Sequence, residues 1–365
     1  MINLFAGQYR NKVVLLTGHT GFKGSWLACW LQQLGAIVVG YSLSAPTQPN
    51  HWSLLRSSVT DCKGDINNLA QMKAIFSQYQ PDIVFHLAAQ ALVRQSYKDP
   101  LTTIETNILG TANVLECARQ TVSVKAVVVI TSDKCYDNPE DGRPLTETDP
   151  MGGYDPYSMS KGAAELVVSS YRNSFFSAAR YGQTHHTLIA SARAGNVIGG
   201  GDWAADRLVP DLIRGTISAS PVAIRNPMAV RPWQHVLEPL SGYLLVGQRL
   251  LQGEILAAEG WNFGPAIYDV LSVRDVIQIA QTHWAAVRAD EQTSDQNPHE
   301  AHLLSLDCSK AQQRLAWHPV WDTPQAIERT ICWYRAFYEQ NRLETQNDLV
   351  AYVQQAQANH IVWTQ

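Results

Sequence analysis

The sequence has few of the features that mark metal-binding, secreted, membrane-embedded or nucleic-acid-binding proteins. Its 6 cysteines form no Cys-x-x-Cys pair and no Cys/His cluster with zinc-ligand spacing, so we expect no metal site and reduced thiols in the cytoplasm. No apolar run approaches membrane-spanning length, and residues 13–17 are too short for a signal-peptide core. The net charge of -4 argues against a nucleic-acid-binding face.

The composition is that of a globular protein, with 45% hydrophobic and 16% charged residues. A chain of 365 residues exceeds the usual size of one core, so we expect one large or two coupled domains. Strand-like apolar runs alternate with helical patterns through the first half, which predicts an α/β fold with a Rossmann-type doubly wound parallel sheet. The strand-like runs are 12–17, 37–43, 82–87 and 125–131, and the helical ones are 23–34, 69–79 and 100–120.

A glycine-rich turn joins the first predicted strand to the first predicted helix. Residues 17–26 read T-G-H-T-G-F-K-G-S-W. Gly18 permits a tight turn, Gly21 lets a pyrophosphate approach the backbone, and Gly24 lets the helix pack on the strand. The pattern predicts a dinucleotide cofactor held by Gly18, Thr20, Gly21, Phe22, Lys23 and Gly24.

The end of the second predicted strand lacks the acid that often holds the adenosine ribose. Residues 40–46 contain no Asp or Glu, and no Arg or Lys that would hold a 2′-phosphate, which favours NAD over NADP and a weakly held ribose. Asp65 and Ile66, which follow Gly64, are candidates for contact with the adenine edge. A turn or helix N-cap before Leu69 is an equally good interpretation of Asp65.

The segment Y-S-M-S-K at 157–161 places Tyr157 and Lys161 on one face of a helix. An ammonium and a nicotinamide cation both favour phenolate, so we expect a lowered pKa for Tyr157, which would take a proton from a sugar hydroxyl. Lys161 would also bind the nicotinamide ribose, and Ser132, after the strand-like run 125–131, is the expected hydroxyl partner. The alternative is a surface Tyr and Lys on an amphipathic helix.

The pattern loosens after about residue 195, and helical stretches return at 238–251, 272–287 and 323–340. We therefore predict an NAD-binding domain over residues 1–195. Residues 196–365 would form a smaller, mixed nucleotide-sugar-binding domain, with a soft boundary because such lobes often exchange strands. The last 20 or so residues are rich in Gln and Asn, which leaves a frayed tail and an oligomer contact as alternatives.

Together these motifs resemble the extended short-chain dehydrogenase/reductase family of NAD-dependent epimerases and dehydratases, over nearly the whole chain. L-A-A-Q at 87–90 resembles the cofactor-wall segment of that family, and Asn107 resembles its structural asparagine on the long helix. The resemblance adds Leu87, Ala88, Ala89, Gln90, Asn107, Thr131, Tyr157 and Lys161 to the expected cofactor-binding residues.

Narrower motifs resemble the CDP-glucose 4,6-dehydratases within that family. They are T-G-H-T-G-F-K-G-S-W at 17–26, T-S-D-K-C-Y at 131–136, M-G-G-Y-D-P-Y-S-M-S-K-G at 151–162 and R-P-W-Q-H-V-L-E-P at 231–239. The related dTDP-glucose dehydratases usually have Thr-Asp-Glu where this chain has Ser132, Asp133 and Lys134. The resemblance therefore implies CDP-glucose as the substrate.

The resemblance also implies a reaction, in which the hexose is oxidised at C4, loses the C6 hydroxyl as water and receives the hydride back at C6. Tyr157, Lys161 and Ser132 would serve the oxidation. Asp133 would protonate the departing hydroxyl and must be neutral at that moment, while Lys134 would remove the C5 proton and must then be uncharged. The alternative for Asp133 and Lys134 is a solvated pair in a loop.

Cations should reach the substrate pyrophosphate. The candidates that match substrate segments of the family are Arg231, Arg207 and Asn196, beside Ser132 and Tyr157. Trp203 and Trp233 are less certain candidates, because such aromatic residues more often pack in the core than bind a substrate. His235 is expected in the core or on the surface, and we assign it no catalytic role.

Two other functions use the same fold. A nucleotide-sugar 4-epimerase shares the cofactor turn and the Tyr/Lys pair but needs no acid and base for C6, so Asp133 and Lys134 argue against it. A regulatory NAD-sensing protein would not need the intact Ser132, Tyr157 and Lys161 set. By resemblance, the pathway makes 3,6-dideoxyhexoses for the O-antigen of lipopolysaccharide, and a helix pair joins a homodimer or homotetramer.

Overall fold

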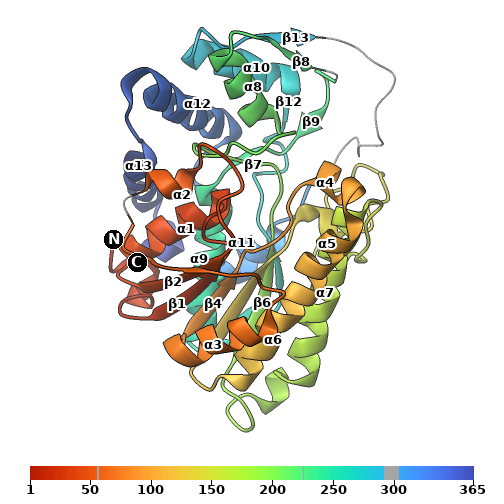
Figure 1. The fold of residues 1–365 in the computed structure, drawn as a ribbon, viewed down its shortest axis with the longest axis vertical. Helices are drawn as coiled ribbons and strands as arrows, with labels where there is room; N and C mark the ends of the chain where they lie inside the picture. Colours follow the sequence, from red (N-terminus) through yellow and green to blue (C-terminus); the bar gives the residue numbers. More distant parts are fainter. Residues whose placement is uncertain (56, 225, 292–303) are drawn as a thin grey trace.

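A twisted, fully parallel sheet of seven strands forms the centre of the computed structural model, which describes residues 1–55, 57–224, 226–291 and 304–365 (Figure 1). The strand order is β11-β6-β5-β4-β1-β2-β3 and every pairing is parallel. The strands are β1 (Val13–Thr17), β2 (Ile37–Ser42), β3 (Thr60–Lys63), β4 (Ile83–His86), β5 (Ala126–Ile130), β6 (Leu188–Arg193) and β11 (Gly260–Asn262).

Helices cover both faces of this sheet, because successive strand residues point to opposite sides. Val14 and Leu16 belong to the core cluster that contains residues of α1 and α9, whereas Leu15 belongs to the cluster beneath α3 and α6. The covering helices are α1 (Phe22–Gln33) and α9 (Leu237–Leu251) on one face, and α3 (Leu69–Tyr79), α6 (Gly110–Gln120) and α7 (Pro156–Ser174) on the other. Helix α13 (Thr345–Ala358) contacts α1 and α9 through Tyr352. The predicted Rossmann-type architecture is confirmed.

The second half of the chain forms a smaller layer beyond the carboxyl ends of the strands (Figure 1). It nevertheless contributes β11 to the central sheet and α9 to one of its faces, so the sheet draws on both halves of the chain. The remaining helices are α2 (His51–Leu54), α4 (Val93–Lys98), α5 (Pro100–Ile104), α8 (Leu208–Ile217), α10 (Val273–His283), α11 (Ser309–Leu315) and α12 (Thr323–Gln340). The remaining strands are β7 (Val197–Ile198), β8 (Val222–Ile224), β9 (Val230–Arg231), β10 (Gln234–His235), β12 (Leu271–Ser272) and β13 (Ala289–Glu291). Six short helical turns complete the fold: η1 (Leu4–Gly7), η2 (Glu105–Leu109), η3 (Asp133–Cys135), η4 (Ala178–Arg180), η5 (Ile255–Ala257) and η6 (Val362–Thr364).

The C-terminal segment is not the frayed tail that its composition allowed, while an oligomer contact through it stays a prediction. Helix α13 buries Leu349 and Tyr352 and exposes its glutamines. The segment is therefore an amphipathic helix although its composition is polar. Beyond it, Trp363 is fully buried and stacks on Phe5, with ring centroids 5.2 Å apart. The two ends of the chain therefore stabilise each other inside the core.

The buried carboxyl of Asp348 on α13 should make the stability of the fold depend on pH. Burial raises the pKa of its carboxyl to about 7, and Arg329, 3.9 Å away, only partly opposes this. Because the folded state keeps its proton to a higher pH than the unfolded state, stability is fully present below pH ~4 and is lost as the pH rises through about 7. We expect a loss on the order of 3 kcal/mol in the free energy of unfolding over that window.

Urea unfolding at a series of pH values checks this prediction. Asp348→Asn should remove the Asp348 part of the pH dependence and leave the protein more stable than wild type at pH ~8, while buried Glu238, whose pKa burial also raises to about 7, keeps its own part. Asp141→Asn, which makes the same charge change at an exposed carboxylate, should keep the wild-type slope. An unchanged slope in Asp348→Asn would show that another group titrates.

Three further observations limit the kinds of site in the described part of the chain. No helix there is long and apolar enough to cross a membrane. In the same ranges, His, Cys, Asp and Glu side chains form no group of three that could hold a metal ion. All six cysteines lie among the described residues, and each is a free thiol.

Candidate active site

The glycine turn forms a cradle between β1 and α1 at the carboxyl edge of the sheet. Gly18 has φ +76°, and a Cβ there would lie 2.6 Å from the backbone nitrogen of Ala88. A Cβ on Gly24 would lie 2.1 Å from the carbonyl oxygen of Gly18. Gly21 is the N-cap residue of α1 and has no side chain that could accept a hydrogen bond from the first N–H groups of the helix. These features fit a dinucleotide pyrophosphate at the helix N-terminus.

Hydroxyl groups stand where an acid usually ends β2. Thr20 Oγ1 lies 2.8 Å from Ser42 Oγ and donates to the carbonyl of Leu43 at 3.0 Å. Asp65 accepts the backbone N–H of Asn67 at 2.9 Å, while Asn68 is the N-cap of α3. Of the two interpretations of Asp65, the turn is observed, and contact with adenine stays a prediction.

His19 is a residue near the cofactor cradle that sequence reasoning passed over. Its ring is fully buried, with Nε2 2.9 Å from Asp61 Oδ1, and it packs edge-on against Trp52. A Cβ on Gly40 would lie 2.4 Å from the ring, so the glycine in β2 makes room for it. The signal was Gly40 itself, a glycine inside a strand that indicates a close approach.

Asn107 fastens the 87–90 segment to α7. Its Nδ2 donates to the carbonyl of Gln90 at 3.0 Å and to Ser160 Oγ at 2.8 Å, while its Oδ1 accepts the N–H of Gln90 at 2.9 Å. The predicted helix 100–120 has a π-helical turn, η2, at this residue. Since both ends of the amide bind protein atoms, Asn107 positions the 87–90 segment, and contact of that segment with a cofactor stays a prediction.

The predicted hydroxyl and phenol lie together. Ser132 follows β5, Tyr157 lies in the first turn of α7, and the Ser132 hydroxyl is near enough to the phenol to lower its pKa. The carboxylate of Asp155 caps α7 by accepting the N–H of Ser158 at 3.0 Å, which fixes where the helix starts. Residues 25 apart in sequence thus converge at the carboxyl edge of the sheet.

The pKa of Tyr157 departs from its expected direction. Burial raises it to about 12, although nearby Ser132 and the charge of Arg207 act to lower it. The expected lowering is therefore wrong for the protein alone, because loss of hydration outweighs the neighbouring charges. Burial also lowers the pKa of the Lys161 ammonium to about 8.

Asp133 and Lys134 occupy different environments in the short helix η3. Asp133 is buried, accepts the Ser132 hydroxyl at 2.8 Å and lies against Gly195, where a Cβ would be 1.8 Å from its Oδ2. Lys134 is half-buried, and its backbone N–H donates to Ser132 Oγ at 3.2 Å. A third lysine, Lys23, has its pKa lowered to about 8 by burial and by nearby Arg207, and also interacts with Asp133.

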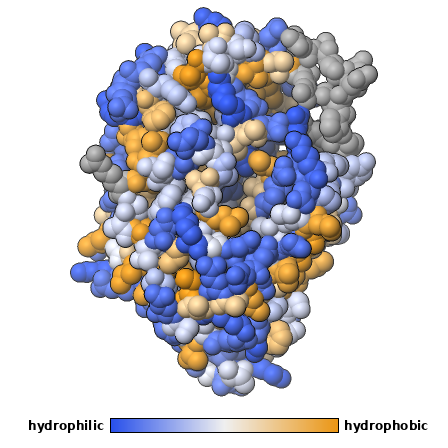
Figure 2. Space-filling view, in the orientation of Figure 1, coloured by the Kyte–Doolittle hydropathy of each residue, from blue (hydrophilic) through white to orange (hydrophobic). Residues whose placement is uncertain are grey.

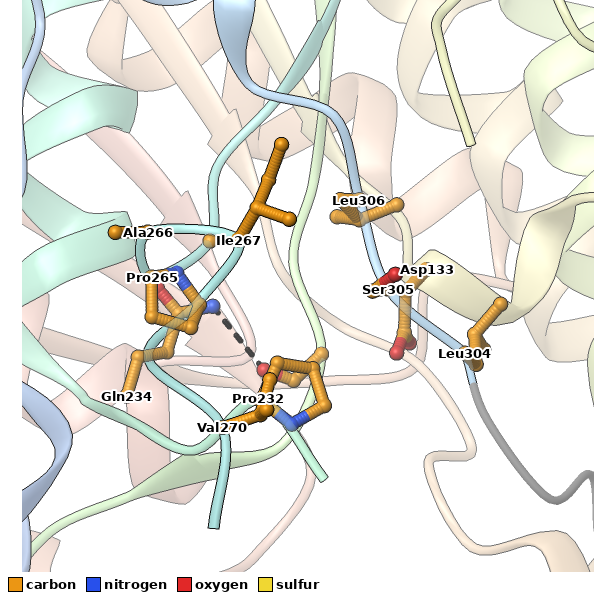
Figure 3. Close-up of a pocket in the computed structure, with 12 residues that line it drawn as sticks. Asp133, Pro232, Gln234, Pro265, Ala266, Ile267, Val270, Leu304, Ser305 and Leu306 are labelled. Atoms are coloured by element: carbon orange, nitrogen blue, oxygen red, sulfur yellow. Dashed lines mark hydrogen bonds between the residues drawn. The ribbon is translucent and has the colours of Figure 1, made fainter. Parts of the chain in front are cut away.

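Asp133 also lines a small pocket between the two parts of the chain (Figure 3). Its other walls are the Gly264–Ile267 loop, the 304–306 strand-like segment and Gln234, whose Nε2 donates to the carbonyl of Gly195 at 3.1 Å. A hollow opens near the centre of the face seen in Figure 2.

The predicted substrate residues are less closely gathered. Arg207 pairs with Asp202 at 2.7 Å and lies within electrostatic range of Tyr157. Arg231 is half-buried on β9 and donates to the carbonyl of Val230, and Asn196 adopts a left-handed conformation with φ 50° after Gly195. Contact of these three with a substrate stays a prediction.

The aromatic candidates near them pack in the core. Trp203 donates from Nε1 to the hydroxyl of Tyr338 at 3.0 Å and lies against Trp333, and Trp233 is also buried. His235 is fully buried, and burial lowers its pKa to about 3. The core interpretation of His235 therefore holds.

Known proteins share this arrangement. The family model for GDP-mannose 4,6 dehydratase matches residues 15–330. A CDP-glucose 4,6-dehydratase of Salmonella typhimurium is 50% identical over 331 residues, which cover 90% of this chain and 92% of that protein. The chain belongs to the GDP-mannose 4,6 dehydratase family. The resemblance to NAD-dependent epimerases and dehydratases is thereby confirmed.

Solved structures of similar proteins have the same fold as this chain. An epimerase from Methanothermobacter thermautotrophicus matches with a TM-score of 0.78 and 24% identity, covering 91% of this chain and 94% of that one. MoeE5, solved in complex with UDP-glucose and NAD, matches with a TM-score of 0.74 and 25% identity, covering 89% and 99%. The fold match extends over both halves of the chain.

Proposed function

We propose that this protein is an NAD-dependent CDP-glucose 4,6-dehydratase, a hydro-lyase that converts CDP-D-glucose to CDP-4-keto-6-deoxy-D-glucose. The observation that carries the proposal is the contact of Ser132 with both Tyr157 and Asp133, beside the glycine cradle. It places a hydroxyl that can serve oxidation next to a carboxyl that can serve elimination. The half-identical Salmonella relative supports the same activity.

The residues of this chain divide the chemistry among them. When bound, NAD accepts a hydride from C4 of the hexose and returns it to C6. Tyr157 takes the proton of the C4 hydroxyl, with Ser132 close beside it and the Lys161 ammonium stabilising the phenolate. The resulting ketone acidifies C5, Asp133 protonates the departing C6 hydroxyl, and Lys134 removes the C5 proton. C5 takes a proton back when the hydride reaches C6. The cradle of Gly18, Gly21 and Gly24 holds the cofactor pyrophosphate.

Lys134 as the base that acts on C5 makes a direct prediction. With Lys134→Met, exchange of the C5 proton with solvent deuterium should fall by about a hundredfold or more, because no other base takes its place. NMR of the recovered sugar nucleotide measures the exchange. Lys125→Met, at an exposed lysine outside the site, should exchange at the wild-type rate. Wild-type exchange in Lys134→Met would remove Lys134 from the mechanism.

A nucleotide-sugar 4-epimerase is the second candidate. It needs the cradle and Tyr157 but has no use for a buried acid next to Ser132. Asp133, held between Ser132 and Gly195, therefore favours elimination over epimerisation.

The experiment that tests the proposed function is turnover with CDP-, dTDP-, UDP- and GDP-hexoses, followed by the alkali absorbance of the 4-keto product. CDP-glucose should be turned over fastest. Preference for a purine nucleotide would contradict the cytidine assignment, and a product without a keto group would favour the epimerase.

The assembly and cellular setting complete the proposal. Exposed leucines lie on the helices that would pair in a homodimer or homotetramer, with Leu101 71%, Leu109 52% and Leu166 60% exposed. Six free thiols suit the cytoplasm. The pathway would supply 3,6-dideoxyhexoses to the O-antigen of lipopolysaccharide.

A further inference from the structure

Behind the catalytic edge lies a buried ion pair that the mechanism above does not use. Glu165, on α7 one turn beyond Lys161, and Arg193, on β6, are 4% and 5% exposed. Arg193 donates to Glu165 from Nε at 2.9 Å and from Nη2 at 2.8 Å. Two buried charges cost solvation, so a pair held this deep needs its remaining hydrogen bonds satisfied.

Two hydroxyls complete the shell of the Glu165 carboxylate. Thr131 donates to Oε1 at 2.5 Å and Ser191 donates to Oε2 at 2.7 Å. Each oxygen thus accepts one hydroxyl and one guanidinium N–H. Although burial acts to raise it, Arg193 and the two hydroxyls hold the pKa of Glu165 below its usual value, so the carboxylate is charged.

The Thr131 and Ser191 hydroxyls differ in the residues next to them in the sequence. Ser191 lies inside β6, with no site residue next to it in sequence. Thr131 directly precedes Ser132, and its own backbone N–H binds the carbonyl of Ala192 at 2.9 Å. The bond from Thr131 to Glu165 therefore ties the end of β5 to α7, the helix that carries Tyr157 and Lys161.

We propose that Glu165 is a positioning residue whose bond to Thr131 fixes the Ser132 hydroxyl relative to the Tyr157 phenol. The proposal rests on the proposed function, since it concerns the residues that serve oxidation at C4. A carboxylate with four fixed donors allows little movement, and proton transfer depends steeply on the separation of the two oxygens.

The network extends from this pair toward the pocket. Arg193 donates its third N–H to the hydroxyl of Tyr136 at 2.6 Å, and Tyr136 donates to Asn262 Oδ1 at 2.7 Å. Asn262 in turn donates to the carbonyls of Leu145 and Asp307, next to the pocket-lining segment 304–306. Glu165 is thus the end of a buried chain of contacts that leads from the wall of the pocket to α7.

Thr131→Val and Ser191→Ala test the proposal as a matched pair, because each removes one hydroxyl from the same carboxylate. Thr131→Val should lower kcat with CDP-glucose by about ten- to a hundredfold. It should also raise the isotope effect of substrate deuterated at C4, because oxidation becomes slower than the later steps. Ser191→Ala should leave kcat and the isotope effect within a few-fold of wild type. Thr131→Val and Ser191→Ala should lose similar stability toward urea. Thr131→Ser, which keeps the hydroxyl, should restore the wild-type isotope effect.

The results that would contradict the positioning role differ from those that would contradict the proposed function. Equal losses of kcat in the two variants, with unchanged isotope effects, would show that Glu165 only stabilises the fold. If Thr131→Val does not fold, Thr131→Ala gives the same comparison. Absence of turnover in the wild type would overturn the proposed function instead. In that case, crystal structures of wild type and Thr131→Val still decide the positioning role, through the separation of Ser132 Oγ and the Tyr157 oxygen, which should increase only in the variant.

Discussion

Replacing Tyr157 with Phe is expected to lower kcat with CDP-glucose by about a thousandfold. The substitution removes the group that takes the C4 proton and keeps the ring that packs at the start of α7. Ser132 keeps its bond to Asp133, so the variant should fold and bind the sugar nucleotide with an affinity within a few-fold of wild type. Steady-state kinetics and calorimetric titration measure the two quantities.

The matched control is Tyr97→Phe, which removes a phenol oxygen from an exposed tyrosine on α4. It should turn over at the wild-type rate. A Tyr157→Phe enzyme that keeps more than a tenth of wild-type kcat would show that another group takes the C4 proton.

Gly195→Ala is expected to produce the second-largest loss, through Asp133. The new Cβ would stand 1.8 Å from Asp133 Oδ2, so the carboxyl must move away from the Ser132 hydroxyl. We expect the elimination of water to slow by about a hundredfold, since misplacement by about 1 Å costs that much. Oxidation at C4 should continue, so rapid mixing should show NADH accumulating instead of turning over.

Asp133→Asn should reproduce this behaviour, because an amide cannot supply the proton. If Gly195→Ala instead loses oxidation and elimination to the same degree, its effect spreads beyond Asp133. If Asp133→Asn turns over normally, the acid lies elsewhere.

The sequence predicted the elements that have strong local signals. The strand-like run 125–131, the helix 69–79 and the glycine turn each correspond to observed elements, because apolar period and glycine placement are local properties. The closeness of Ser132 to Tyr157 was predicted from the place of Ser132 at the end of the strand-like run 125–131. Strands β3, β6 and β11 went unrecognised. β3 and β11 have only four and three residues, and β6 mixes apolar residues with Ser191 and Arg193, so none has a strong strand pattern.

The parts that sequence reasoning missed depend on partners far apart in the chain. Glu165 lies four residues after Lys161, on the same helical face, and that spacing was an available signal. Its partner Arg193 could be found only from the pairing of β6 with β5. The raised pKa of Tyr157 likewise follows from burial, which no spacing reveals.

Internal hydride transfer is the centre of this account, and one labelling measurement tests it directly. CDP-glucose deuterated at C4 should give a 4-keto-6-deoxy product whose C6 methyl group carries the deuterium, as seen by NMR. Loss of the label to solvent, or its retention at C4 of an unchanged or epimerised hexose, would contradict the account.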